Sequence, residues 1–345
     1  MSQTLDDVAK TAGVSRSTVS RVINAHPNVS ADTRSRVEHA IEKCGYRPNA
    51  VARSLATNRT NIIGIVVPES VTKLFTDPYF PLMLRGATEA CNRNGYHLIL
   101  SLFTGSIDSD VMHDRIARSG YIEGVVLANS SLDEMLVPSL FKEGIPFVNI
   151  GRHPDDRVNY IDVDNLGGAR MATEHLIRMG HTRIATIAGP NNMAPGQDRL
   201  EGFLEVMRAH RLPVSKEMIA EGDYTEAGGR AAMMQLLNVR PTAVFASSDT
   251  MAIGAIKAIR AANLAIPDDI SVIGFDDIPS GLTIDPELTT VRQPIEQIGR
   301  LAVETLFNVI SDSTSGKREA SVHRLVLPTE LVIRKSCGHG MSRKD

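Results

Sequence analysis

The fold of the N-terminal part of the chain is decided by the stretch Leu5-Asp-Asp-Val-Ala-Lys-Thr-Ala-Gly-Val-Ser-Arg-Ser-Thr-Val-Ser-Arg-Val-Ile-Asn24. A first helix is indicated by apolar side chains that recur at the spacing of one helix face, namely Leu5, Val8, Ala9 and Ala12. Gly13 follows, and glycine tolerates the positive φ that a tight turn after a helix requires. The stretch therefore predicts a short amphipathic helix that ends in a turn.

A second helix is expected after this turn, beginning at Ser15, a residue type that caps helix N-termini. Its apolar side consists of Val19, Val22 and Ile23. Within about 140° of each other on the opposite side lie Arg16, Ser17, Ser20 and Arg21. A third helix is expected to begin at Ser30 and to bury Val37, Ile41 and Cys44. Two short helices joined by a glycine turn, the second with an Arg-bearing outer face, are typical of a helix-turn-helix.

The distribution of charge supports this interpretation. The formal net charge of −3 looks unrelated to nucleic acid, but residues 1–60 hold nine Lys or Arg against five Asp or Glu, a net of +4, and the remainder carries −7. A basic head on an acidic body is expected when only one end of a protein meets a polyanion. The alternative is a small helical bundle with solvated charges; the Arg-bearing face and the local basicity favour DNA binding.

Length and composition exclude several protein classes. The 345 residues suffice for two or three domains, and 42% hydrophobic with 22% charged residues is the usual globular mixture. No apolar run approaches the roughly 18 residues that span a bilayer, and the start MSQTLDDVAK lacks the pattern of a signal peptide. Cys44, Cys91 and Cys337 lie far apart without CxxC spacing, so neither disulfides nor a zinc site is expected. These features predict a cytoplasmic protein.

The N-terminal segment resembles the DNA-binding head of LacI/GalR-family transcription regulators. The resemblance rests on Leu5–Asn24 and on the motifs Val29-Ser-Ala-Asp-Thr-Arg34 and Gly45-Tyr-Arg-Pro-Asn-Ala-Val-Ala-Arg-Ser-Leu55. It implies base-reading positions for Arg16, Ser17 and Arg21, and DNA-backbone contacts for Thr4, Ser15, Ser20, Asn24, Ser30 and Thr33. This division is chemically reasonable, because hydroxyls and amides position a helix on phosphates whereas Arg can bridge O6 and N7 of guanine.

Residues 47–60 form the expected hinge helix and linker. Pro48 disfavours continuation of the preceding helix and Asn49 can cap a new one, but a helix of nine residues is marginal in water. The resemblance implies that this helix pairs with that of a second subunit in the minor groove, where Leu55 wedges between base pairs. Ala52 would allow close approach and Arg53 would meet phosphate or a groove edge. The alternative role of Leu55 is to anchor the linker to the body.

Apolar runs and amphipathic stretches alternate in the body of the chain, which predicts parallel sheets with helices on both faces. The expected strands are Ile62–Val67, His97–Ser101, Gly124–Ala128, Pro146–Ile150, Arg183–Ala188, Ala243–Ala246 and Ser271–Phe275. The expected helices lie near residues 79–94, 107–119, 133–143, 165–179, 198–211, 227–237, 250–263 and 295–311, with a late strand at about 324–333.

The alternation of strands and helices is interrupted around residues 152–163, and this interruption divides the units into two lobes. The expected organisation is a head at 1–46, a core at 61–335 and a tail at 336–345. Lobe 1 would cover about 61–161 and 292–322, and lobe 2 about 162–291 and 323–335. The core resembles the periplasmic-binding-protein-like core of the same family over Thr173–Ile184, Asp198–Phe203, Pro267–Asp277 and Pro286–Pro294. The expected fold is thus an all-α helix-turn-helix domain followed by an α/β core of two doubly wound parallel-sheet lobes.

Such two-lobed cores bind ligands at the carboxyl ends of their strands. Asp276 directly follows the predicted strand Ser271–Phe275, and a carboxylate there can accept hydrogen bonds from hydroxyls. The resemblance implies effector contacts for Arg199, for Tyr224 as an aromatic lid and for Arg152 at one side of the pocket. Further candidates are Ser248 and Asp249 after a strand, Asp164 at the crossing between lobes, and Phe80, for which a core position is an equal alternative. The family often has Asn where Ser248 stands, so the reach of this side chain is shortened.

The chemistry of these residues favours a polyhydroxylated ligand. The chain has no Trp, and polar groups of both signs with few aromatic rings suit a sugar or sugar derivative better than a flat nucleobase. A purine or a phosphorylated corepressor is the alternative effector. The resemblance implies that tetrameric members carry a leucine heptad segment after the core, and none follows Leu331–Lys335, so a homodimer is expected. Each head of the dimer would bind one half-site of a pseudo-palindromic operator. Effector binding would reorient the lobes and so shift the hinge helices, as inducer or corepressor.

Enzymatic functions find no support in the sequence. Asp276 and Asp277 are adjacent on a strand, so their side chains point to opposite faces and cannot act as an acid–base pair. His175 and His181 lack a third metal ligand nearby, and Gly189–Gly196 lacks the phosphate-loop motif. The expected function is therefore that of a transcription regulator acting as a repressor, without catalytic activity, metal or cofactor. A solute-binding protein that does not bind DNA is the alternative from another class.

Overall fold

The computed structural model describes residues 4–23, 26–46, 59–67, 71–102, 120–128, 136–314 and 322–338. The chain divides after Thr60 into two compact units, a small N-terminal head and a large core. Each unit is described by itself. None of the described helices has the length and apolar character needed to cross a membrane.

The head consists of three helices, α1 (Leu5–Ala12), α2 (Arg16–Ile23) and α3 (Ala31–Cys44). They enclose a small apolar core whose buried residues are Val8, Ala9, Ala12, Val19, Val22, Val37 and Ala40. Gly13 ends α1 with φ of +64°, and its N–H donates to carbonyls of the last helical turn. The predicted helices are present, although Ile41 and Cys44 pack against the core only partly buried.

The first lobe of the core contains a sheet with the strand order β11-β5-β4-β3-β1-β2, in which all described pairings are parallel. Its strands are β1 (Ile62–Val67), β2 (His97–Leu102), β3 (Gly124–Leu127), β4 (Phe147–Ile150), β5 (Tyr160–Val163) and β11 (Arg324–Leu327). Its described helices are α5 (Val71–Thr76), α6 (Tyr79–Arg93), α8 (Leu136–Glu143) and α14 (Ile295–Thr314). The helix expected near 107–119 lies outside the described residues.

The second lobe contains a sheet with the order β12-β10-β9-β8-β6-β7. Its strands are β6 (Ile184–Ala188), β7 (Ile219–Glu221), β8 (Ala243–Ala246), β9 (Ser271–Asp276), β10 (Thr289–Arg292) and β12 (Glu330–Val332). Its helices are α9 (Asn165–Arg178), α10 (Ala194–Ala209), α11 (Glu226–Leu236), α12 (Asp249–Ala261) and α13 (Ser280–Thr283), with 3₁₀ turns at Lys216–Met218 and Leu237–Val239. The prediction of a wholly parallel sheet is wrong at one edge, because strand β12 is antiparallel to β10.

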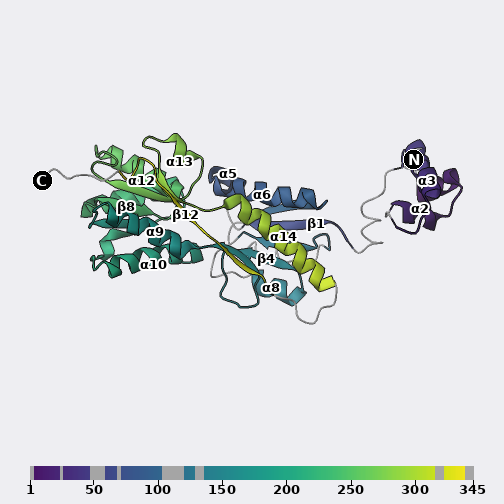
Figure 1. Cartoon of the computed structure of the whole chain (residues 1–345), viewed down its shortest axis with the longest axis horizontal. Helices are drawn as coiled ribbons and strands as arrows, with labels where there is room; N and C mark the ends of the chain where they lie inside the picture. Colours follow the sequence, from purple (N-terminus) through teal and green to yellow (C-terminus); the bar gives the residue numbers. More distant parts are fainter. Residues whose placement is uncertain are drawn as a thin grey trace. The chain divides into compact units, whose positions relative to one another are not determined.

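Helices cover both faces of the second sheet because its strands bury alternate side chains in opposite directions. Val244 packs in the cluster under α11 and α12, whereas its neighbour Phe245 packs under α9 and α10. Val272 and Ile273 divide between the same two clusters. A strand buried on both faces reads as a continuous apolar run, which is why the sequence pattern predicted these strands. Figure 1 shows α12 on one side of this sheet and α9 and α10 on the other.

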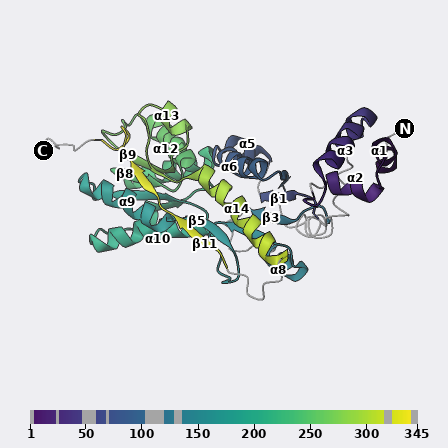
Figure 2. The same ribbon diagram turned by 45° about the vertical axis from the view of Figure 1, so that its right-hand side comes forward.

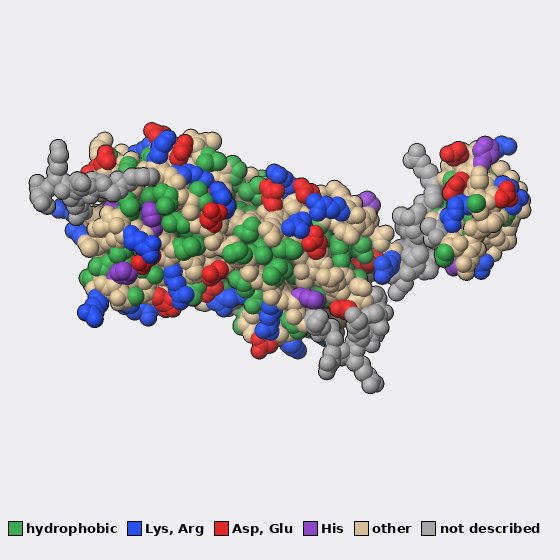
Figure 3. Space-filling model, viewed as in Figure 1, with side chains coloured by type: hydrophobic (Ala, Val, Ile, Leu, Met, Phe, Trp, Pro, Cys, Tyr) green, Lys and Arg blue, Asp and Glu red, His purple; other side chains and the backbone are tan. Residues whose placement is uncertain are grey.

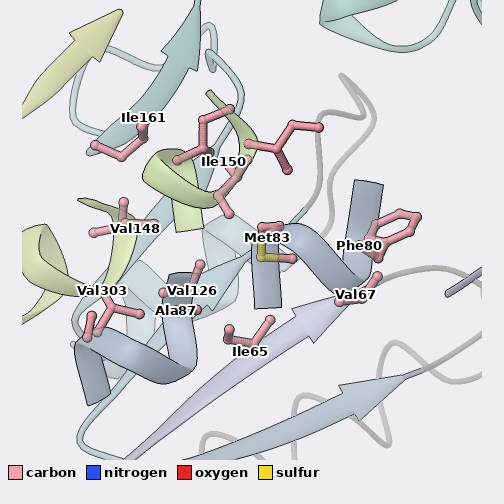
Figure 4. Packing of buried hydrophobic residues seen from close by; sticks show 14 of the residues in the cluster. Ile65, Val67, Phe80, Met83, Ala87, Val126, Val148, Ile150, Ile161 and Val303 are labelled. Atoms are coloured by element: carbon pink, nitrogen blue, oxygen red, sulfur yellow. The ribbon is translucent and has the colours of Figure 1, made fainter. Parts of the chain in front are cut away.

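The first lobe depends on a close approach of α6 and α14, which run side by side in Figures 1 and 2. A Cβ atom added at Gly86 would lie 1.9 Å from the carbonyl oxygen of Glu296, and one added at Gly299 would lie 2.0 Å from that of Met83. Glycine at both positions lets the helix backbones touch. Below this contact, Met83 and Val303 pack over the apolar side chains of the sheet, as Figure 4 shows.

The chain crosses between the lobes at positions that differ from those expected. Strand β5 continues the first lobe to Val163, and β10 keeps the second lobe to Arg292. The late strand expected at about 324–333 consists of two strands, and only the second lies in the second lobe as expected: Arg324–Leu327 pairs with β5 in the first lobe and Glu330–Val332 with β10 in the second. Pro328 separates them, because proline has no N–H to continue a ladder.

The expected tail also begins too early. Ser336 and Cys337 are buried in the second lobe. The Ser336 hydroxyl donates to the carbonyl of Val272 at 2.6 Å and accepts from the N–H of Thr289 at 2.8 Å. These polar contacts attach the end of the described chain to two strands of the sheet.

Figure 3 shows hydrophobic side chains gathered across the middle of the core and charged ones toward its edges.

Candidate DNA-binding and effector sites

The outer face of α2 carries the side chains predicted to read bases. Arg16, Ser17 and Arg21 are exposed, whereas Val19 and Val22 on the other side are buried. Arg16 lies 3.8 Å from the Asp6 carboxylate, a contact between exposed groups that contributes little free energy. The head therefore exposes two arginines and a serine on one helix face, and none of the three packs in its apolar core.

The side chains predicted to contact the DNA backbone cluster at helix N-termini. Thr4 caps α1 in a reciprocal box with Asp7, in which the Thr4 hydroxyl donates to the carboxylate at 2.7 Å. Ser15 accepts from the N–H of Thr18 at 3.1 Å, and Ser30 accepts from that of Thr33 at 3.3 Å. Helix N-termini favour anions through their unpaired N–H groups and the helix dipole.

The remaining DNA-binding predictions are only partly described. Ser20 is half-buried on α2, beside the exposed Arg21. Five predicted residues lie outside the described part of the chain, namely Asn24, Asn49, Ala52, Arg53 and Leu55. The expected hinge helix therefore stays a prediction.

Arg199 is the centre of the effector site in the core. It projects from α10, is buried, and donates from Nε to Oδ1 of Asn165 at 2.9 Å and from Nη1 to the carbonyl of Ser247 at 2.6 Å. Its guanidinium carbon lies 3.6 Å from the ring centroid of Phe275. These contacts hold the guanidinium in one orientation, which is what recognition of a small polar ligand requires.

Asp276 faces Arg199 from the end of β9, where Oδ1 lies 3.6 Å from Nη1 of Arg199. Gln293, at the second crossing between lobes, donates from Nε2 to the same oxygen at 2.5 Å. Burial raises the pKa of Asp276 to about 7, and the charge of Arg199 opposes that rise. The backbone of Asp276 has φ of +125°, an uncommon conformation for a residue other than glycine. The structure thus holds a buried carboxyl beside a buried cation.

A second ion pair joins the two lobes. Arg152, which follows β4, donates from Nε and Nη2 to the two carboxylate oxygens of Asp198 in α10, at 2.8 and 2.5 Å. The N–H of Arg152 also donates to Asp162 at 3.0 Å, and Asp162 accepts from Nδ2 of Asn165 at 3.0 Å. We call this set the interlobe cluster, consisting of Arg152, Asp162, Asn165, Asp198, Arg199, Asp276 and Gln293.

Several predicted effector residues have structural partners instead. Asp249 is fully buried and accepts from the Thr290 hydroxyl at 2.5 Å and from the N–H of Ile278 at 2.9 Å. Burial, with the neighbouring Asp276, raises the pKa of Asp249. Ser248 caps α12, and the exposed Asp164 caps α9. Their predicted contact with an effector stays a prediction.

Phe80 lies in the apolar core of the first lobe, as its alternative interpretation expected. Its neighbour Tyr79 is close to the interlobe cluster, since the charge of Asp276 adds to burial in raising the pKa of the Tyr79 phenol. Tyr224 adopts φ of +62°, and burial raises its pKa to about 12. The charges of Arg199 and Asp276 also act on Tyr224, which places this aromatic ring near the cluster.

Among the described residues, four buried side-chain atoms have no hydrogen-bond partner in the protein: Asn149 Oδ1, Tyr224 OH, Ser247 Oγ and His323 Nε2. The first three lie at or just after the carboxyl ends of β4, β7 and β8. Buried polar atoms are nearly always paired, so this group indicates a site for a polar ligand. Sequence reasoning missed Asn149, Asp162, Asn165, Asp198, Ser247 and Gln293. For Asp198, which lies in α10, the available signal was the motif Asp198–Phe203, and for the others it was their position at strand ends and crossings.

Comparison with known proteins identifies the family. Residues 4–49 match the model of bacterial regulatory proteins of the lacI family, and residues 173–337 match the periplasmic binding protein-like domain. The chain is 39% identical to the HTH-type transcriptional regulator CelR of Thermobifida fusca over 338 residues, covering 96% of this chain and 98% of the relative. The chain belongs to the lacI family.

Further similarities support the assignment of this protein to the lacI family. It is 34% identical to the ribose operon repressor of Halalkalibacterium halodurans, over 99% of both chains. Its fold resembles a CelR–cellobiose complex with a TM-score of 0.76, 37% identity and coverage of 97% and 99% of the two chains. It also resembles the lac repressor dimer bound to operator and the anti-inducer ONPF, with a TM-score of 0.85, 29% identity and coverage of 98% and 99%.

These findings confirm the predicted fold class and family. The lacI-family protein is a DNA-binding transcriptional repressor controlled by a small-molecule effector. The relatives found are transcriptional regulators rather than enzymes. Among the described residues, no group of three or more His, Cys, Asp or Glu is arranged to hold a metal ion.

Proposed function

We propose that the effector of this repressor is a sugar or sugar derivative bound at the interlobe cluster. The observation that carries the proposal is the combination of fixed donors and acceptors with three buried polar atoms that have no hydrogen-bond partner among the described residues. A sugar hydroxyl both donates and accepts, so it can satisfy Asn149 Oδ1, Tyr224 OH and Ser247 Oγ. The CelR–cellobiose complex shows a similar chain with a sugar bound.

A nucleobase fits these groups less well. A flat ring is best held between aromatic faces, but the ring of Phe275 is already covered by the guanidinium of Arg199. The cover of the Phe275 ring by Arg199 is the observation that favours a sugar over the purine alternative.

The test is a thermal-shift screen of the full chain with cellobiose, ribose, adenine and guanine. A ligand at 100 times its Kd stabilises the native state by about 2.7 kcal/mol. We expect a sugar to raise the Tm and a nucleobase to leave it unchanged. Arg199→Lys should abolish the shift because the two-pronged guanidinium is lost, whereas Arg208→Lys, exposed on the same helix, should retain it. A shift with a nucleobase and none with any sugar would overturn the proposal.

We propose further that the repressor acts as a homodimer on a pseudo-palindromic operator, with one head on each half-site. The lac repressor dimer on its operator is the structural parallel. Phe75 in α5 is 70% exposed and Val71 59%, an apolar surface that suits contact with a second copy. Size-exclusion chromatography with light scattering should give twice the chain mass of 37.5 kDa. A monomer that still binds operator with full affinity would contradict the dimer.

The absence of catalysis and the cytoplasmic location are also part of the proposal. The repressor must reach chromosomal DNA, and the cytoplasm is where that DNA lies. Its effector should be recovered chemically unchanged after incubation with the protein. Chromatography of the sugar before and after incubation checks this expectation, and a new product formed in proportion to protein would contradict it.

A further inference from the structure

The ion pair between Arg152 and Asp198 lies at the accessible edge of the interlobe cluster. The two side chains are 41% and 20% exposed, whereas Arg199 at the centre is 6% exposed. Two N–H groups of Arg152 are aligned with two oxygens of Asp198. Such a two-bond pair fixes both position and orientation. A ligand that enters the cluster therefore meets an arginine whose charge is already matched.

The other charges of the cluster are also balanced or negative. Arg199 faces Asp276, and the cluster contains a third carboxyl in Asp162. Burial raises the pKa of Asp162, and the charge of Asp198 adds to that rise. The charge of Asp77 raises the pKa of Asp276, and the charge of Asp276 in turn raises the pKa of Asp249. The two cations of the interlobe cluster, Arg152 and Arg199, therefore each face a carboxyl group already.

We propose that Asp198 is a specificity-determining residue that directs this site to uncharged sugars and excludes sugars bearing a carboxylate or phosphate. The inference rests on the proposed function, that the cluster binds a sugar. Neutral hydroxyls can still accept from the remaining N–H groups of the two guanidiniums and donate to carboxylate oxygens. An added anion, by contrast, would have to displace Asp198 from Arg152 and leave that carboxylate unpaired.

Asp198→Asn tests this role because asparagine keeps the size of the side chain and removes its charge. Arg152 then becomes an unmatched cation that can bind a carboxylate or phosphate with two hydrogen bonds. The double variant Arg152→Gln with Asp198→Asn removes that cation again. Arg152→Gln alone leaves Asp198 unpaired, so it should exclude anions more strongly than the wild type does.

The experiment is isothermal titration of the full chain with three matched probes: cellobiose, cellobionate and cellobiose 6′-phosphate. For the wild type we expect cellobiose to bind at least about tenfold more tightly than either anion. Asp198→Asn should reduce this ratio by about tenfold or more, and the double variant should restore it. Glu205→Gln on the same helix removes an equal charge from a carboxylate that pairs with Arg170, and should leave the ratio unchanged.

The ratio separates specificity from affinity, because loss of the interlobe contact weakens all three probes together. An unchanged ratio in Asp198→Asn, or wild-type binding of the anions as tight as that of cellobiose, overturns this proposal and leaves the sugar site intact. A gain in anion binding that persists in the double variant also overturns it, since the gain would not depend on Arg152. If no probe binds any variant, the proposed sugar function fails and this inference with it.

Discussion

Arg199 and Asp276 lie 3.6 Å apart, from Nη1 to Oδ1, with both side chains buried between α10 and the end of β9. At this separation the pair is held by charge rather than by a direct hydrogen bond. Each partner instead bonds to neutral groups, Arg199 to Asn165 and the carbonyl of Ser247, and Asp276 to Gln293. Both charged groups therefore keep part of their capacity for a ligand.

Removing one member of this pair should destabilise the core. Above pH 7, where Asp276 is ionised, we expect Arg199→Ala to lower the free energy of unfolding by about 3 kcal/mol or more, because the charge of Asp276 is left buried and uncompensated. Adding Asp276→Asn to Arg199→Ala should recover part of that loss. Urea unfolding of the three variants measures the effect. Arg208→Ala, exposed on the same helix, is the control and should change stability by less than about 0.5 kcal/mol.

The raised pKa of Asp276 predicts a pH dependence of stability. The folded carboxyl holds its proton to about pH 7, whereas the unfolded one loses it near the ordinary value of 3.8. The native state therefore binds more protons between these values, and its stability falls as pH rises, by at most about 1.4 kcal/mol per pH unit for one group. Asp276→Asn removes this group.

The Tm of Asp276→Asn relative to wild type should accordingly increase from pH 4 to pH 7 and level off above it. Thermal unfolding without effector at several pH values gives this difference. Asp285→Asn is a suitable control, since its carboxylate is almost fully exposed. A Tm difference that stays constant over this range would show that Asp276 does not hold its proton in the folded protein.

The exposed face of α2 should determine operator specificity. Arg21→Ala is expected to weaken specific operator binding by about 1–3 kcal/mol and to relax the preference at one base pair. Effector binding should be unchanged because the substitution lies in the other unit of the chain. Lys43→Ala, in the last turn of α3, is the matched control. Equal losses in both variants would indicate a general charge effect and reject the assignment of the recognition face.

The contact between α6 and α14 predicts a severe effect of a single methyl group. A Cβ at position 86 would lie 1.9 Å from a carbonyl oxygen of α14, so Gly86→Ala must push the helices apart. We expect a loss of about 1–3 kcal/mol in unfolding free energy. Thr88→Ala, exposed on the same helix, should be nearly neutral. Similar urea midpoints for these two variants would mean that the helices separate without loss.

The helix-turn-helix and most strands of the core could be predicted because their signals are local. Val8 and Val19 each belong to a set of apolar residues that recur at helical spacing. Runs such as Ile62–Val67 are apolar because helices cover both faces of the sheet. The short strands β5, β7 and β10 escaped prediction, because polar or charged residues such as Asp162, Glu221 and Thr290 leave them without a continuous apolar run. Arg199 was predicted from the resemblance and Asp276 from its position directly after a strand, and the structure brings the two together.

The sequence by itself determined the family, the basic head and the alternation of strands and helices, because motifs, local charge and periodicity each depend on residues that are close together in the chain. Only the tertiary structure decided that Arg324–Leu327 belongs to the first sheet and Glu330–Val332 to the second, because strand pairing depends on distant partners. It also decided that Asp198 matches the charge of Arg152 across the lobes. The periodicity of a helix is a local property, whereas the partner of a charge is set by the folding of the whole chain.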